Sequence, residues 1–274
     1  MNRRADLSSS LKFYILTDLE GVAGVSRWSQ TREPSDVNKI FAMDLLTEEI
    51  NAAVAGILAV HPRATVDVFD GHGALGINAL RLHPRAQLFL GAPPNPLAGL
   101  NDSYTAMLFV GQHAMAGTPE APLCHTYSSR EVKSYRLNGE EMGEFGCRTL
   151  LAASQGVPVI FLSGDDKAVA EAKAFLPNLE TVTTKIGGGI QWALHLSPVE
   201  SQRRIRAGVQ RAVAGLRRQN RAAIRQRLPK RMPPYVLTVT LLPGVDSKPW
   251  IQRGGHRSRN RIVFRGNSLT QLPI

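Results

Sequence analysis

Three runs of β-branched and aromatic residues in this sequence each end at side chains that can bind a metal. The runs cover residues 12–17, 65–69 and 105–110, and each is expected to form a strand. The side chains that follow them are Asp18 and Glu20, Asp70 and His72, and His113. Because the carboxyl ends of parallel strands lie at one edge of a sheet, these groups are expected to converge there.

Asp18 and Glu20 are two residues apart, so in an extended segment both side chains point to the same side. Two such carboxylates repel each other, and a bound cation relieves the repulsion. Mixed carboxylate and imidazole ligands suit zinc or a similar divalent ion, and this number of ligands allows two ions about 3.5–4 Å apart. A single Asp after a strand is commonly a helix cap, and Asp70-Gly71 alone is a turn. Their coincidence at three strand ends favours a metal site.

The elements that must position these groups alternate along the chain. Helical periodicity covers 40–60, 145–155 and about 167–175, and a further strand is expected at 157–162. This alternation predicts an α/β fold with a mainly parallel β-sheet flanked by helices. We expect a metal-binding catalytic domain over 11–197 and a smaller α+β C-terminal domain over 198–274. The smaller domain holds a long basic helix at 199–228 and a strand at 235–241, and no core is expected after residue 246.

The charge of the chain is concentrated in its last part. The 274 residues carry 33 Lys and Arg against 22 Asp and Glu, but residues 196–274 alone have 17 basic and 2 acidic side chains. This suggests a rival function, nucleic-acid binding, which needs a basic surface. Aromatic residues are nearly absent from the tail of this segment, which has only Trp250 and Phe264, so we rank nucleic-acid binding below a metal-dependent enzyme. The hydrophobic content of 43% excludes a mostly disordered chain.

The expected location is the cytoplasm. No apolar run approaches the roughly 18 residues that cross a bilayer, and no signal-peptide core follows the first ten residues, so no membrane contact is expected. The cysteines, Cys124 and Cys147, are too few for a disulfide framework, which agrees with a reducing compartment.

Five motifs, spread in a consistent order over residues 12–198, give the chain a resemblance to a known family. They are Asp18-Leu19-Glu20-Gly21-Val22-Ala23-Gly24, Asp70-Gly71-His72, Gly111-Gln112-His113-Ala114 with Thr118-Pro119, Cys124-His125-Thr126, and Asn138-Gly139 with Gly143-Glu144-Phe145-Gly146. This set resembles the zinc-dependent D-aminopeptidases encoded beside bacterial dipeptide permeases.

The resemblance implies a ligand set for two zinc ions per subunit and one catalytic residue. In that family an aspartate bridges the two ions. The matching positions are Asp18 as the bridge, Glu20 and His72 on one ion, His113 and Glu144 on the other, and His125 as the catalytic histidine. Glu144 enters only through the resemblance, because an acid in the first turn of a helix is otherwise explained by the helix dipole.

The implied reaction is removal of an N-terminal D-amino acid from a short peptide by attack of a metal-activated water. We expect His125 to move a proton or to stabilise the oxyanion, and Cys124 to be a packing residue. The family also implies a homo-oligomer, a closed ring of ten subunits. After residue 198 the resemblance weakens. Another binuclear metal-dependent amidohydrolase or a phosphoesterase remains an alternative.

Overall fold

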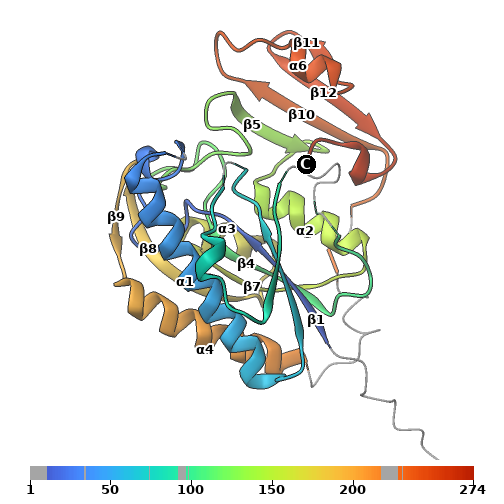
Figure 1. The fold of residues 1–274 in the computed structure, drawn as a ribbon. Coiled ribbons are helices and arrows are strands. Elements are labelled where there is room, and N and C mark those ends of the chain that lie inside the picture. The colour runs from blue at the N-terminus through green and yellow to red at the C-terminus, as the bar shows by residue number, and fades with distance from the viewer. Residues whose placement is uncertain are drawn as a thin grey trace, which may run out of the picture.

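The computed structural model describes residues 11–33, 35–73, 75–91, 97, 99–216, 228–229 and 231–274. These residues form two β-sheets with helices around them (Figure 1). The larger sheet occupies the body of the molecule, and the smaller one lies at its upper end in the view of Figure 1. Within the described part of the chain, no helix is long and apolar enough to cross a membrane.

The larger sheet has seven strands, and all neighbouring pairs are parallel except the last, β8 with β9. In spatial order the strands are β3 (Ala86–Phe89), β2 (Thr65–Asp70), β1 (Lys12–Thr17), β4 (Ala106–Gln112), β7 (Val159–Asp165), β8 (Glu180–Gly189) and β9 (Trp192–His195). The expected mainly parallel α/β fold is therefore confirmed. The chain builds outward in opposite directions from β1 and β4, which makes the gap between their carboxyl ends the switch point where ligands bind in such sheets.

Alternation along β1 divides the core between the two faces of this sheet. Phe13 and Ile15 pack with α1 (Val37–Val60) and α4 (Pro198–Leu216), which contact each other along their length. Tyr14 and Leu16 point to the opposite face and pack with α2 (Glu144–Ser154), whose neighbour is α3 (Asp166–Phe175). Both faces are covered, as a parallel sheet requires.

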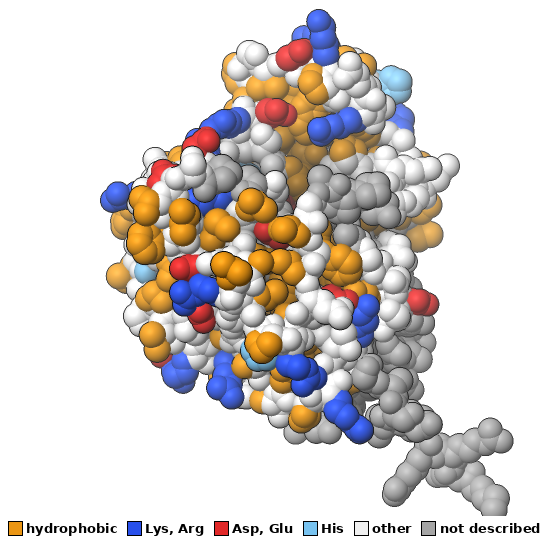
Figure 2. Space-filling model, viewed as in Figure 1, with side chains coloured by type: hydrophobic (Ala, Val, Ile, Leu, Met, Phe, Trp, Pro, Cys, Tyr) orange, Lys and Arg blue, Asp and Glu red, His pale blue; other side chains and the backbone are white. Residues whose placement is uncertain are grey.

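The smaller sheet is antiparallel and has five strands. Their order is β11 (His256–Ser258), β12 (Arg261–Gly266), β10 (Tyr235–Leu241), β5 (Val132–Leu137) and β6 (Glu140–Glu141). One face of this sheet joins the apolar core beside α2, and hydrophobic side chains gather below it on the surface shown in Figure 2. The remaining short elements are η1 (Trp28–Gln30), η2 (Ala79–Arg81), α6 (Lys248–Gln252) and η3 (Leu269–Gln271).

The end of the chain differs from expectation. The absence of a core after residue 246 was a wrong prediction, because Trp250, Ile262 and Phe264 are buried there. The alternating strand β12 sets Ile262 and Phe264 opposite Val239 and Leu237 of β10, and Trp250 packs edge-on against Phe264. Of the described strands, β1, β2, β4, β7 and β10 were predicted. The strands not predicted are β3, β5, β6, β8, β9, β11 and β12.

The expected domain boundary after residue 197 coincides with the start of α4. That two domains meet there stays a prediction. The second sheet, however, pairs β5 from before it with β10 from after it. The expected helix at 199–228 begins at Pro198 and is seen as far as Leu216; residues 217–227 lie outside the described part.

Candidate metal centre

The loop that follows β1 crosses the carboxyl end of β4. Asp18 N–H donates to the Val110 carbonyl at 2.9 Å, and Gly21 N–H donates to the Gly111 carbonyl at 2.7 Å. Gly111 has a φ of +82°, and a Cβ atom there would run into the carbonyl of Asp18. Glycine at this position therefore lets the loop lie directly on β4, which brings Asp18 and Glu20 to the switch point.

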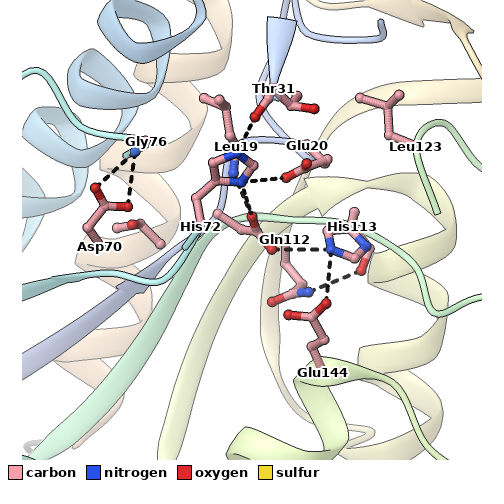
Figure 3. A network of polar contacts seen from close by, with 12 residues as sticks. Leu19, Glu20, Thr31, Asp70, His72, Gly76, Gln112, His113, Leu123 and Glu144 are labelled. Atoms are coloured by element: carbon pink, nitrogen blue, oxygen red, sulfur yellow. Dashed lines mark hydrogen bonds and ion pairs between the residues drawn. The ribbon is translucent and has the colours of Figure 1, made fainter. Parts of the chain in front are cut away.

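Asp18 stands between two imidazoles that come from two other strand ends. Its Oδ1 lies 3.2 Å from His72 Nδ1, and its Oδ2 lies 3.2 Å from His113 Nε2. Glu20 Oε2 is 3.0 Å from the same nitrogen of His72, so that ring faces two carboxylates (Figure 3). The three strand ends singled out in the sequence thus do converge.

Helix α2 contributes the carboxylate on the other side of His113. Glu144 is the first residue of this helix, where the helix dipole favours a negative charge, and its Oε1 accepts a hydrogen bond from Tyr127 N–H at 2.6 Å. That oxygen lies 3.5 Å from His113 Nε2 and 3.9 Å from His125 Nε2. The rings of His113 and His125 stack with their centroids 4.0 Å apart.

Backbone carbonyls fix which nitrogen each histidine presents to this cluster. His72 Nε2 is 2.6 Å from the Thr31 carbonyl, His113 Nδ1 is 2.9 Å from the Ala114 carbonyl, and His125 Nδ1 is 2.8 Å from the Leu123 carbonyl. A carbonyl only accepts, so each of these nitrogens must carry the hydrogen. In a neutral ring the opposite nitrogen then offers a lone pair toward carboxylates, which is the arrangement of metal-binding histidines with their outer hydrogen-bond partners.

Without a metal, protonated imidazoles and ionised carboxylates alternate within the cluster. Burial disfavours the ionised form of Asp18, but His113 and His72 hold the pKa of Asp18 well below its usual value. Burial likewise opposes the charge on His72 and on His113, yet Glu20 and Asp18 raise the pKa of His72, and Asp18 and Glu144 raise the pKa of His113. Metal binding displaces such protons, since ligating imidazoles must be neutral.

The donor set fits a divalent cation. Two groups bring one atom from each member within 4.8 Å of the others, namely Asp18 with Glu20 and His113, and His113 with His125 and Glu144. Glu20 Oε2 and His113 Nε2 are buried and make no well-formed hydrogen bond within the described chain. Buried polar atoms without hydrogen bonds are costly, and a bound cation would add a ligand bond to both atoms beyond the ion-pair contacts given above. A divalent cation held by these residues would polarise a carbonyl and lower the pKa of a water molecule.

All six residues expected from the sequence, Asp18, Glu20, His72, His113, His125 and Glu144, therefore lie in one cluster. Asp70 lies outside the cluster, because its carboxylate accepts from Gly76 N–H at 2.9 Å and holds the turn that carries His72. Cys124 is half-buried, and burial raises the pKa of its thiol, which disfavours a nucleophilic thiolate.

Several residues around the cluster were not found from the sequence. Lys185 and Thr184 of β8 are buried and bond to the loop between Glu20 and Val25. The one signal for Lys185 is a lysine within a run of Thr, Val and Ile, and such a lysine is usually solvated. Trp28 packs edge-on against His125 with the ring centroids 5.9 Å apart.

A parallel sheet with imidazoles and carboxylates gathered at its switch point defines an α/β enzyme with a metal-competent centre. A model of the peptidase family described as D-aminopeptidase matches residues 11–242. The chain therefore belongs to the D-aminopeptidase family, as its motifs indicated.

Two relatives add detail. The D-aminopeptidase of Bacillus subtilis strain 168 is 31% identical over 186 residues, and the match spans 64% of this chain and 64% of that protein. The solved structure of DppA from Bacillus subtilis, a zinc-dependent D-aminopeptidase and self-compartmentalizing protease, aligns with a TM-score of 0.82. That alignment covers 95% of this chain and 93% of DppA at 23% identity, and so describes a shared fold.

Proposed function

We propose that this protein is a binuclear zinc metallopeptidase that removes N-terminal D-amino acids from short peptides. One observation carries the proposal: the two oxygens of Asp18 face two different imidazoles, each at 3.2 Å. A carboxylate shared in this way is what a pair of metal ions about 3.5–4 Å apart requires. Membership of the D-aminopeptidase family and the zinc dependence of DppA support the substrate class and the metal.

The ligand assignment follows the contacts of Asp18. We assign Glu20 and His72 to one ion and His113 and Glu144 to the other, with Asp18 shared. When bound, zinc would polarise the scissile carbonyl and lower the pKa of a water molecule toward 7. The backbone carbonyls on His72 and His113 hold both rings in the tautomer that a ligand needs.

His125 is proposed to handle the proton. Its Nδ1–H is fixed on the Leu123 carbonyl, which leaves Nε2 directed toward Glu144 at 3.9 Å. That nitrogen can accept a proton from the attacking water and return it to the departing amine, which is the role of a general acid and base. Trp28 packs against this ring with the centroids 5.9 Å apart, and the His125 side chain is 14% exposed.

The decisive experiment combines metal analysis with a stereochemical pair of substrates. The purified chain is expected to contain close to two zinc ions and to release D-Ala from D-Ala-D-Ala but not L-Ala from L-Ala-L-Ala. Hydrolysis of p-nitrophenyl phosphate with no peptide cleavage would instead identify a phosphoesterase. A chain that takes up no divalent metal would refute the proposal.

A variant of His125 tests whether this residue transfers a proton or binds metal, since it also belongs to one of the metal-competent groups. His125→Ala is expected to keep the zinc content of the wild type and to lose activity by about 10²–10⁴-fold, the usual contribution of a positioned acid–base group. Loss of one zinc ion in this variant would make His125 a ligand and would contradict the proton-transfer role.

We also propose that the protein self-associates in the cytoplasm, as a ring of ten subunits. DppA is self-compartmentalizing, and the edge strand β9 of this chain exposes Trp192 and Leu194 by 63% and 71%, with Phe41 of α1 exposed by 65%. Exposed apolar residues of this size are typical of contact surfaces. Both cysteines are unpaired, in accord with a reducing compartment. Light scattering on the eluted protein would give the subunit number.

A further inference from the structure

The loop between β1 and η1, which carries Asp18 and Glu20, has its backbone held by buried side chains from distant elements. Lys185 Nζ, in β8, donates to the carbonyls of Glu20 and Val25 and, at 3.1 Å, to the carbonyl of Val22. An ammonium has three N–H donors and no acceptor, so these three carbonyls use its full capacity. One side chain therefore fixes three points of the loop at once.

The neighbouring residue in β8 and a residue in β9 hold the same loop. Thr184 Oγ1 lies 2.6 Å from the Gly21 carbonyl and 3.0 Å from the Gly164 carbonyl. His195 Nδ1 accepts from Gly24 N–H at 2.9 Å. The clamp, as we call Thr184, Lys185 and His195, thus reaches backbone groups from residue 20 to residue 25.

Burying the ammonium of Lys185 is unfavourable, which indicates that the clamp has a role beyond filling space. Lys185 is 1% exposed, and burial lowers the pKa of its ammonium to about 8. Within the described chain, its hydrogen bonds go to these three backbone carbonyls and none goes to a carboxylate. An apolar side chain of similar volume would fill the same space without that desolvation cost, but it would leave three carbonyls of the loop unpaired.

We propose that Lys185 and Thr184 are positioning residues that fix the loop bearing Asp18 and Glu20 and so set the zinc affinity of the centre. This inference rests on the proposed function, since it concerns the same metal site. Neither residue touches the reacting atoms; both act through the backbone of the loop. Removing an outer partner of a metal ligand typically costs 10–100-fold in metal affinity or activity, and we expect losses in that range.

The test compares two buried threonines that lose the same hydroxyl. Thr184→Val leaves the Gly21 carbonyl without this partner, whereas Thr149→Val removes a buried α2 hydroxyl that has no hydrogen-bond partner in the described chain. Zinc is titrated calorimetrically into metal-free protein, cobalt is substituted for zinc to record its visible spectrum, and circular dichroism checks the fold. Lys185→Met is measured in the same way.

Thr184→Val is expected to fold, to bind zinc about 10–100-fold more weakly than the wild type and to shift the cobalt spectrum. Thr149→Val is expected to match the wild type in both. Wild-type affinity and an unchanged cobalt spectrum in folded Thr184→Val would overturn the inference and leave the proposed function intact, and Thr184→Val decides the matter if Lys185→Met does not fold. Failure of the wild type to bind zinc would refute the proposed function and this inference with it.

Discussion

The two sheets treat buried polarity in opposite ways. The carboxyl edge of the seven-stranded sheet buries charged groups such as Asp18, Glu20 and Lys185, whereas the described strands of the five-stranded sheet bury no charged side chain. Burying charge is costly unless it is compensated by partners, and burying apolar surface is favourable without them. Buried charge at the edge of the first sheet therefore lowers stability, and apolar packing against the second sheet offsets part of that loss.

The largest effect is expected where the polar edge loses its central group. Asp18→Ala removes the carboxylate that faces both His72 and His113, so zinc binding and peptidase activity should fall by more than about 100-fold, the upper end for outer partners of ligands. Zinc content and D-Ala release would be measured against Asp102→Ala, an exposed carboxylate variant. Retained activity in Asp18→Ala would show that the buried charges at the edge of the first sheet do not form the active centre.

The apolar sheet should respond in stability and not in metal binding. Phe264→Ala deletes a ring that is 2% exposed and packs edge-on against Trp250, so the free energy of unfolding should fall by about 3–5 kcal/mol. Urea unfolding measures this loss, and calorimetry on the folded variant should return the zinc affinity of the wild type. A large fall in zinc affinity would show that the second sheet also positions the ligands.

A pH-dependent effect is expected at Glu49, whose carboxylate accepts from Ala23 N–H in the loop and from Ser201. Burial raises the pKa of Glu49 from 4.5 to about 7. Below pH 4.5 this carboxyl is protonated in both states; as the pH rises to about 7 the unfolded state loses its proton first, so the contribution to stability falls, by at most about 3 kcal/mol.

Glu49→Gln should therefore gain stability relative to the wild type as the pH rises from 4.5 to 7. Thermal unfolding over this range measures the difference. The matched control is Glu48→Gln on the same helix, where the side chain is 35% exposed and pairs with Arg81. A difference that is independent of pH in Glu49→Gln would mean that the buried carboxyl is not protonated more readily in the folded state.

The smallest effect is expected on the basic surface of α4. Arg211 is 61% exposed and pairs with Glu180 at 2.7 Å, and exposed pairs contribute less than about 1 kcal/mol. Arg211→Ala should leave activity and zinc content unchanged and lower stability only slightly. A large loss of binding to double-stranded DNA in this variant, at a salt concentration where the wild type still binds, would instead revive the nucleic-acid interpretation.

The parts of the molecule that were predictable from sequence are those with local signals. The strand over residues 12–17 and its following carboxylates are visible because the apolar run and the strand-end residues lie within ten positions of each other. The pairing of β5 with β10 joins residues about 100 positions apart, and nothing local to either strand indicates its partner. That is why only one strand of the second sheet, over residues 235–241, was predicted from the sequence.

The same distinction holds within the site. Asp18, Glu20, His72 and His113 follow strands and could be inferred from the residues. Glu144 begins a helix, where an acid has an ordinary explanation, and only its motif pointed to it. Lys185 was missed because its partners are main-chain carbonyls, which leave no trace in the sequence.

The path of β5 and β6 sets the order in which the centre can be completed during synthesis. These strands directly precede Gly143 and Glu144, yet β5 has β10 as its long-range neighbour. Until residues 235–241 have left the ribosome, β5 lacks one of its two partner strands. The strands that precede Asp18, His72 and His113 can already pair by then. We therefore expect Glu144 to reach its final position later than Asp18, His72 and His113, after most of the chain has been translated.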